Sequence, residues 1–304
     1  MGPPADMAKA LDYSSLANKS VLITGGASGL GSFIAAECAK HHAHVTIADI
    51  KETEGRAYQQ RLKGEGLEVN FVQTDVTDWT SLVAAFKSAI NHSHNSSIDV
   101  VVAVAGLFGA PFILPNEEPA SLDRDPPPPP TAGPVFDVNI KGVYYTSKLA
   151  QHYFGLNPTS SPETKGKKSL IVMGSLLGYI EMPEVVDYPT SKWAVRGFFR
   201  EARGPMERSG YRINLIAPWI MDTPMSKDFC EMFRSHDIAV GNPRDVVTAV
   251  IRCATDESIS GRALGIGATG TFDLMDDREG GDSAPVIKHY LETEGKNYAD
   301  FFHV

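Results

Sequence analysis

The segment "SVLITGGASGLG" (residues 20–31) joins an apolar stretch of strand length to a glycine-rich turn and the start of a helix. Glycines in such a turn let backbone N–H groups approach a pyrophosphate at the N-terminus of the helix. A plain strand-to-helix turn would carry the same residues, so the neighbouring sequence has to separate the two interpretations. Further along, "HVTIAD" (residues 44–49) ends in Asp49, where a dinucleotide-binding unit places its carboxylate for the ribose hydroxyls. The two features together favour dinucleotide binding over a turn followed by a helix-capping aspartate.

Apolar segments of strand length alternate with amphipathic segments of helix length along most of the chain. The strands are apolar nearly throughout instead of alternating, which indicates a sheet that is covered on both faces. We therefore expect an α/β fold, a Rossmann-type doubly wound parallel sheet with helices on both faces, in a single domain. Strands are predicted at residues 20–25, 44–49, 68–72, 98–106, 169–175, 212–218 and 262–268, and helices at residues 30–40, 54–63 and 81–91.

Three segments lie outside this alternation. Residues 1–14 are predicted to be a flexible N-terminal segment, residues 15–274 the catalytic domain, and residues 275–304 a C-terminal tail that either packs as a short helix or closes over a pocket. Residues 123–134 contain five consecutive prolines, which fit neither a helix nor a central strand. A surface loop is the favoured interpretation, and a docking site for a proline-recognising module is the alternative.

Composition excludes several classes of function. The 304 residues carry a net charge of -9, which disfavours nucleic acid or an anionic membrane as a partner. The longest apolar run is too short to span a bilayer, and the N-terminus lacks the apolar segment of a secretion signal, so we expect a cytoplasmic protein. The three cysteines fit neither a disulfide framework nor a zinc site. Two histidine-rich stretches, "HHAH" (residues 41–44) and "HSH" (residues 92–94), fall at predicted helix ends without a carboxylate or thiolate cluster, so we expect solvated helix ends and no metal.

The stretch "DYPTSKWAVRG" (residues 187–197) places Lys192 one helical turn after Tyr188. A free tyrosine has a pKa near 10, and a cation within about 4–6 Å lowers that pKa. Pro189 suits the first turn of the helix that would hold the pair. A solvated Tyr–Lys pair is the alternative for this motif by itself. A phenol that transfers a proton is favoured once Ser175, at the end of another strand, is taken into account.

From about residue 15 to residue 267, the chain resembles the short-chain dehydrogenase/reductase family. Within the family it is most similar to 15-hydroxyprostaglandin dehydrogenase-type and fungal metabolic members. "AVAG" (residues 103–106) stands where the family usually carries NNAG, so both asparagines are absent, and Trp219 replaces the glycine of PGxxxTxM. The matching residues are Gly25, Gly29 and Gly31 (TGxxxGxG), Asp75 and Val76 after the third strand, Asn139 in a helix, Ser175, Tyr188 and Lys192 (YxxxK), and Pro218 with Thr223 in "PWIMDTPM".

The resemblance implies roles for these residues. Tyr188 is the general acid or base, Ser175 orients the substrate oxygen, Lys192 lowers the Tyr188 pKa and holds the nicotinamide ribose, and Asn139 supports a water that relays the proton. The implied cofactor-binding residues are Gly25, Ser28, Gly29, Leu30, Gly31, Asp49, Asp75, Val76, Ala105, Gly106, Tyr188, Lys192, Pro218, Ile220 and Thr223.

The leading hypothesis is an NAD-dependent alcohol dehydrogenase or ketoreductase that acts on an apolar secondary alcohol or ketone, such as a lipid-like, polyketide-like or other secondary-metabolite substrate. NAD is expected because the Asp49 carboxylate would repel the extra phosphate of NADP, although Lys51 lies two residues away. The alternative is a dinucleotide-binding protein of the same fold with a non-redox or sensor role. The predicted substrate lining is Leu176, Met182, Trp219, Met225, Phe229 and Phe233.

A homodimer or homotetramer is also expected. The helices that carry Asn139 and Tyr188 build such interfaces in the similar family. Val143, Leu149 and Phe154 add apolar residues beyond what one sheet-facing stripe of the first helix obviously needs.

Overall fold

The computed structural model describes residues 4–113, 121–125, 127–156, 167–182 and 185–276. Its centre is one eight-stranded sheet in the order β3-β2-β1-β4-β5-β6-β7-β8. All neighbouring strands are parallel except the last pair, in which β8 returns antiparallel to β7. The strands are β1 (Ser20–Thr24), β2 (His44–Asp49), β3 (Val69–Gln73), β4 (Val100–Ala103), β5 (Ser169–Met173), β6 (Arg212–Pro218), β7 (Ala263–Ile266) and β8 (Thr271–Asp273).

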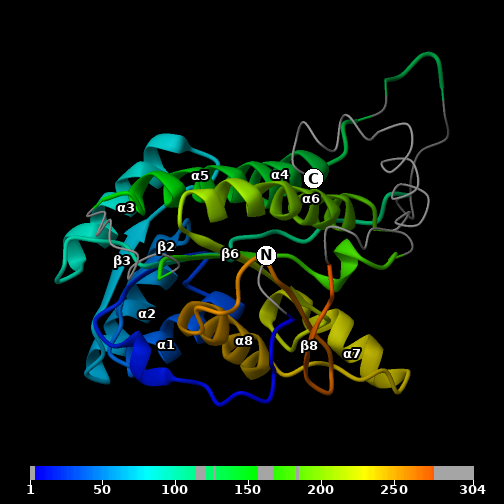
Figure 1. Cartoon of the computed structure of the whole chain (residues 1–304). Helices are drawn as coiled ribbons and strands as arrows, with labels where there is room; N and C mark the ends of the chain where they lie inside the picture. The colour runs from blue at the N-terminus through cyan, green and yellow to red at the C-terminus, as the bar shows by residue number, and fades with distance from the viewer. Residues whose placement is uncertain (1–3, 114–120, 126, 157–166, 183–184, 277–304) are drawn as a thin grey trace, which may run out of the picture.

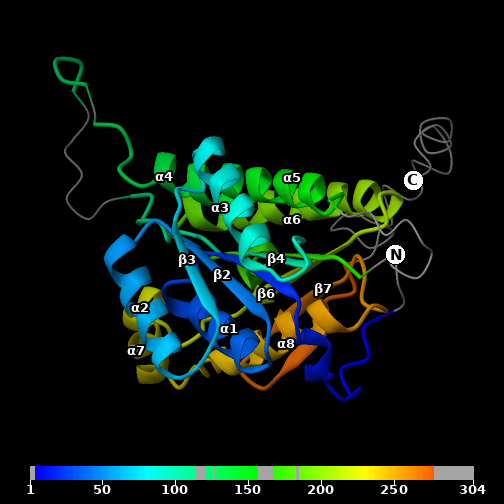
Figure 2. The same ribbon diagram turned by 90° about the vertical axis from the view of Figure 1, so that its left-hand side faces the viewer.

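Helices cover both faces of the sheet, as Figures 1 and 2 show. One face carries α3 (Trp79–His92), α5 (Val143–Tyr153) and α6 (Asp187–Arg208), and the other carries α1 (Gly29–Lys40), α2 (Glu52–Gly64) and α8 (Pro243–Thr255). The short helix α4 (Ala132–Phe136) and the π-helical turn η2 (Asp137–Gly142) lead into α5, and α7 (Lys227–Ser235) follows the 3-10 turn η5 (Pro224–Ser226). The shorter 3-10 turns are η1 (Tyr13–Leu16) and η4 (Leu176–Gly178). This arrangement confirms the doubly wound α/β fold.

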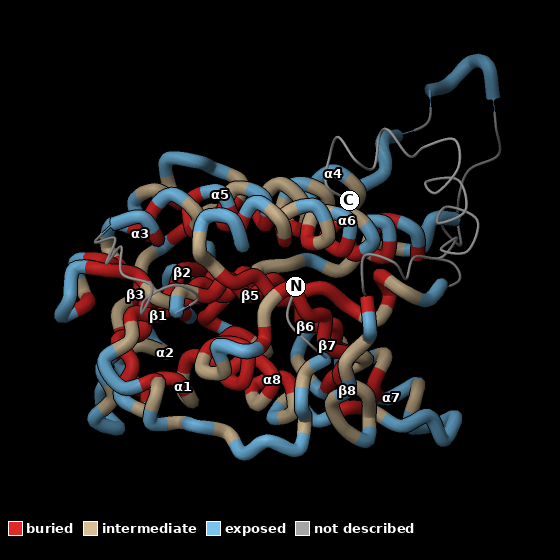
Figure 3. The backbone as a smooth tube through the Cα atoms, in the orientation of Figure 1, coloured by how far each residue is buried: buried red, intermediate tan, exposed pale blue. Residues whose placement is uncertain are grey.

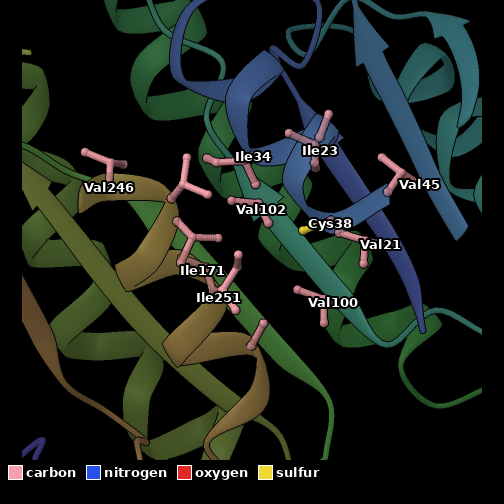
Figure 4. Packing of buried hydrophobic residues seen from close by; sticks show 14 of the residues in the cluster. Val21, Ile23, Ile34, Cys38, Val45, Val100, Val102, Ile171, Val246 and Ile251 are labelled. Atoms are coloured by element: carbon pink, nitrogen blue, oxygen red, sulfur yellow. The ribbon is translucent and has the colours of Figure 1, made fainter. Parts of the chain in front are cut away.

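Two apolar layers explain why the strands are apolar at nearly every position. Along β1, Val21 and Ile23 face α1 and α8, whereas Leu22 between them faces α3, α5 and α6. The buried part of the chain therefore runs through the sheet and the inner faces of both helix layers (Figure 3). Figure 4 shows the layer on the α1 and α8 side, where Ile34 and Ile251 pack against valines and isoleucines of β1, β4 and β5.

The strand order reverses beside β1, which pairs with β2 on one side and with β4 on the other. In open parallel sheets a crevice forms at such a reversal, at the carboxyl ends of the strands. Strand β4 ends at Ala103, where its partner β1 ends at Thr24, so residues 104–106 leave the ladder earlier than the sequence predicted. The last three residues of the "AVAG" segment consequently form a loop at the crevice.

The two ends of the described chain are attached to the domain. The Arg252 guanidinium of α8 donates hydrogen bonds to the carbonyls of Asp6, Met7 and Lys9 at 2.7–3.3 Å. The predicted N-terminal segment therefore lies against α8 where it is described, instead of being free of the domain. At the other end, the Asp276 carboxylate accepts hydrogen bonds from the Tyr179 hydroxyl at 2.9 Å and from Arg196 Nε at 3.1 Å. The rest of the predicted tail, residues 277–304, lies outside the described residues.

Several sequence predictions need correction. The predicted proline-rich loop (residues 123–134) already enters α4 at Ala132, because Pro134 is tolerated in a first helical turn. Helix α8 and strand β8 were not predicted. Val143, Leu149 and Phe154 are buried in the layer under α5, so they are core residues and do not argue for an interface. His44 is not in a solvated helix end, because it begins β2 and is buried.

Candidate active site

A cleft of about 520 Å³ opens at the carboxyl ends of β1, β2, β4, β5 and β6. Every residue that the sequence analysis assigned to the cofactor lines it, so the fold brings together residues spread over 199 positions, from Gly25 to Thr223. The same cleft holds Ser175, Tyr188 and Lys192. Sequence analysis missed further lining residues, among them Thr74, Phe108, Leu177 and Met221.

Two glycines of the turn, Gly25 and Gly31, are packed too tightly for a side chain. Gly25 has φ +70, and a Cβ there would lie 2.7 Å from Ala105 Cα. A Cβ on Gly31 would lie 2.2 Å from the carbonyl oxygen of Gly25. Ser28, the N-cap of α1, makes no side-chain hydrogen bond to the helix start, so the first N–H groups of α1 keep their capacity to bind an anion. This cradle fits the pyrophosphate of a dinucleotide.

Asp49 is fixed at the end of β2 by two backbone donors. Ala27 N–H donates to Oδ2 and Lys51 N–H donates to Oδ1, both at 3.0 Å. Each oxygen keeps a second acceptor position, and the carboxylate lines the cleft although Asp49 is buried. The residues present therefore fit a dinucleotide whose ribose hydroxyls donate to Asp49.

At the opposite end of the cleft, Ser175 follows β5 and Tyr188 lies in the first turn of α6. The Ser175 hydroxyl donates to the Pro218 carbonyl at 3.3 Å, accepts from Leu177 N–H at 3.1 Å, and is hydrogen-bonded to the Tyr188 phenol. Lys192 Nζ lies 5.3 Å from the centre of the Tyr188 ring and donates to the Met173 carbonyl at 3.0 Å. The three side chains thus converge on one region of the cleft wall.

The pKa of Tyr188 moves in the opposite direction from the one expected. Burial raises the pKa of the Tyr188 phenol to about 12, and the hydrogen bond with Ser175 opposes that rise only in part. Lys192 directs its ammonium to the Met173 carbonyl, and burial lowers the pKa of Lys192 to about 8. At neutral pH the phenol therefore carries its proton and can donate it to an oxygen that gains negative charge.

Asn139 does not line the cleft. It is fully buried in the π-helical turn η2, where its Oδ1 accepts from Leu107 N–H at 2.8 Å. Its Nδ2 donates to the Leu107 carbonyl and to Ser191 Oγ, both at 2.9 Å, and Ser191 Oγ in turn donates to the Tyr188 carbonyl at 2.6 Å. Asn139 therefore braces the loop after β4 against the first turn of α6. Its relay of a proton through water stays a prediction.

A second brace next to Tyr188 was not found from the sequence. The buried Asp187 carboxylate accepts from Thr131 Oγ1 at 2.6 Å and from Tyr188 N–H at 2.7 Å. A Cβ on Gly109 would lie 1.6 Å from Asp187 Oδ1, so only glycine fits at position 109 of the loop after β4. The contact joins residues 56 and 78 positions apart, and no local pattern in the sequence signals it.

Aromatic and sulfur-containing side chains form the wall beside the phenol. Phe108 lies between Tyr188 and Phe229, with ring centres 4.6 Å and 5.0 Å away. Of the predicted substrate lining, Trp219, Met225 and Phe229 line the cleft, whereas Leu176, Met182 and Phe233 do not. Leu177 takes the place of Leu176 because the turn η4 points the next residue inward, and Phe233 packs against Trp219 at 5.8 Å.

Comparisons with known proteins show which family the chain is similar to. A family model described as short chain dehydrogenase matches residues 19–232. A 5'-hydroxyaverantin dehydrogenase of Dothistroma septosporum is 41% identical over 93% of this chain and 96% of its own length, and one of Emericella nidulans is 36% identical over 89% and 91%. An NADP-dependent dehydrogenase of a Phoma species is 34% identical over 84% and 76%.

Among solved structures, a short-chain type dehydrogenase/reductase from Mycobacterium marinum has a TM-score of 0.71 at 21% identity, over 84% of this chain and 97% of that one. This likeness concerns the fold. Within the described residues, every helix is too short or too polar to cross a bilayer.

The buried ammonium of Lys192 predicts a cost in stability that depends on pH. Below about pH 8 Lys192 is protonated in both the folded and the unfolded chain, so the full cost of burying the charge remains. Between about 8 and the ordinary value of 10.5 the unfolded chain binds more protons than the folded one, and stability rises with pH. We expect Lys192→Met to raise the free energy of unfolding at pH 7 by up to about 3 kcal/mol, and the gain to shrink from pH 8 to pH 10.

Urea unfolding at each pH measures this difference. Lys148→Met, on the exposed side of α5, is the matched control and should change stability by less than about 0.5 kcal/mol at any pH. A Lys192→Met protein that is no more stable than the parent at pH 7 would contradict the assignment of a strained, buried ammonium.

Proposed function

Because the chain belongs to the short-chain dehydrogenase family, we propose that it transfers a hydride between NAD and a secondary alcohol or ketone on a bulky, apolar secondary metabolite. Membership makes it an oxidoreductase that acts on CH–OH groups with a nicotinamide cofactor. The observation that carries the finer proposal is the cleft itself, which has a fixed carboxylate at one end and the Ser175, Tyr188 and Lys192 group beside an aromatic wall at the other.

A proton and an oriented substrate oxygen are what this chain's residues supply to the reaction. The Tyr188 phenol is protonated at neutral pH and donates its proton to the oxygen of a ketone during reduction, or takes it back during oxidation. Ser175 hydrogen-bonds the same oxygen and holds the phenol in place. Lys192 places a cation near the ring, which favours the phenolate that remains after proton donation. When bound, the nicotinamide supplies the hydride chemistry.

The substrate class follows from the wall next to Tyr188. Phe108, Trp219, Met225 and Phe229 present flat or apolar surfaces, and the nearby Lys192 ammonium already donates to the Met173 carbonyl. Two relatives are named as dehydrogenases of 5'-hydroxyaverantin, which supports a large hydroxylated secondary metabolite as the substrate of this chain. We propose 5'-hydroxyaverantin or a compound like it.

The proposed activity is tested by the absorbance of reduced nicotinamide with a panel that includes 5'-hydroxyaverantin, other bulky secondary alcohols and ketones, and short hydroxy acids. Turnover with the bulky compounds is expected, and a preference for short, charged hydroxy acids would overturn the substrate class. Binding of the cofactor without turnover of any compound would favour a sensor or another non-redox role.

Tyr188→Phe should lower kcat by about 10²- to 10⁴-fold, because it removes the transferable proton and little else. The Kd for the cofactor, measured by calorimetry, should stay the same. Tyr144→Phe, which removes the hydroxyl of an exposed tyrosine on α5, is the control and should keep full turnover. Substantial activity in Tyr188→Phe would reject Tyr188 as the proton donor.

NAD is the proposed cofactor because Asp49 cannot turn away from the cleft. Its two oxygens are held by the backbone of Ala27 and Lys51, so a 2'-phosphate would lie against a fixed negative charge. Like unit charges at 4 Å repel by about 4 kcal/mol at an effective dielectric of 20, and solvent and salt reduce this value. Half of that repulsion is still more than a tenfold preference. One relative is named as NADP-dependent, so the preference of this chain for NAD over NADP has to be measured.

We expect the parent protein to have at least a tenfold higher kcat/KM with NAD than with NADP, and Asp49→Ala to narrow that ratio. Glu54→Ala is the matched control, since Glu54 is an exposed acid in the first turn of α2 that does not line the cleft. Equal efficiency with the two cofactors in the parent protein would overturn the assignment to NAD.

A homodimer or homotetramer is proposed through the outer face of α5 and α6. Tyr144 and Trp193 are exposed there, and the Tyr144 ring lies 5.6 Å from that of Phe198. Multi-angle light scattering at micromolar concentration should give two or four times the mass of one chain, and Trp193→Glu should reduce it. Phe33→Glu, on the exposed side of α1, is the control. A monomer mass for the parent protein would reject this proposal.

A further inference from the structure

A second group of polar side chains lies at the amino-terminal edge of the sheet, opposite the catalytic cleft. His44 begins β2 and Glu68 precedes β3 directly, and the register that pairs Val45 with Val69 places the two residues side by side. Helix α3 packs against both strands (Figure 2), and His94 lies in the loop that follows this helix. Three segments of the chain therefore meet at this edge.

The three side chains converge to the separation of ligands around one ion. One nitrogen of each histidine and one oxygen of Glu68 all lie within 4.8 Å of one another. His44 Nδ1 is 3.0 Å from Glu68 Oε2, and the His44 and His94 rings have their centres 4.0 Å apart. Two ligands of a tetrahedral zinc ion at about 2.0–2.1 Å are themselves about 3.3 Å apart, which is close to the 3.0 Å between His44 Nδ1 and Glu68 Oε2, and the exposed His94 ring would have to rotate to complete the set.

His44 is buried, yet neither of its ring nitrogens has a hydrogen-bond partner. Its Nδ1 lies 3.0 Å from Glu68 Oε2, so this carboxylate is a charged neighbour of the ring, although the contact lacks the geometry of a hydrogen bond. A buried imidazole without partners is otherwise costly and rare.

We propose that His44, Glu68 and His94 bind a divalent transition-metal ion, most favourably Zn²⁺, at the edge of the sheet away from the active site. Two imidazoles and one carboxylate are ligands that zinc prefers, and a water completes the tetrahedron on the exposed side of Glu68 and His94. The ion cross-links β2, β3 and the loop between α3 and β4. This assignment replaces the expectation of solvated histidines, which did not foresee Glu68 as a neighbour.

A third histidine supports the site from behind. His92 ends α3 with its buried Nε2 unpartnered, and its ring centre lies 6.1 Å from that of His44. The His92 ring therefore lies directly behind the His44 ring on the side of α3.

The test uses the whole chain without a histidine tag, stripped with a chelator and titrated with ZnCl₂ by calorimetry. One equivalent of zinc should bind, and Co²⁺ in its place should give the visible absorption of a four-coordinate site. At about 100 times the Kd, zinc should raise the melting temperature by roughly 4 °C. Absence of saturable binding at one equivalent would overturn the proposal.

His94→Ala and Glu68→Gln change exposed residues and should leave the fold intact while weakening zinc binding at least about tenfold. His236→Ala is the matched control, because His236 is an exposed histidine at the end of α7. It should bind zinc as the parent does. If His94→Ala and Glu68→Gln kept the parent affinity, the metal would be bound by other surface groups and the assigned site would be wrong.

Discussion

The close approach of three backbone segments around the glycine turn is the constraint on which the rest of the structure depends. The turn after β1, the "AVAG" loop after β4 and the start of α1 are so close that a single Cβ on Gly31 would overlap the Gly25 carbonyl. This contact fixes where α1 begins. Ala27 lies between the two glycines, and its N–H donates to the Asp49 carboxylate and holds it at the end of β2. One turn therefore sets both the anion cradle and the acid at the far end of the cleft.

The reacting end of the cleft is held by buried polar groups that are linked to one another. Asn139 ties the loop after β4 to Ser191, and Asp187 ties the same loop and Thr131 to the start of α6. Both contacts flank Tyr188, whose hydroxyl they leave for Ser175 and the substrate. A lysine buried near the phenol has a lowered pKa, so the site keeps a charge where a hydrophobic residue would be more favourable for folding. Function and stability are opposed at this position.

Much of the fold could be predicted from the sequence, because the spacing and number of apolar residues in each segment indicate helices and a sheet that is buried on both faces. The bounds of β2 and β6 were correct, and the glycine turn and Asp49 were assigned to one cofactor site from their positions at the ends of the first two strands. Contacts between distant segments were not predictable. Phe108 and Gly109 lie in the loop after β4, and no sequence pattern signals their contacts with Tyr188 and Asp187. Glu68 reads as an ordinary surface acid, and only the register of β2 and β3 shows that it lies beside His44. The pKa of Tyr188 was misjudged because a spacing of four residues gives a distance to Lys192 but says nothing of burial.

The contact of Asp276 with α6 has a consequence for where the folded unit ends. Its carboxylate, three residues after the end of β8, lies against Arg196, Arg200 and Tyr179, and its carbonyl accepts from Arg203. Arg196 is one turn beyond Lys192 on the helix that also carries the phenol. Truncation at the end of β8 would thus remove an internal counter-charge from the catalytic helix. The minimal autonomous unit of this protein extends past β8, and a fusion partner joined directly after Asp273 would perturb the candidate active site from a distance.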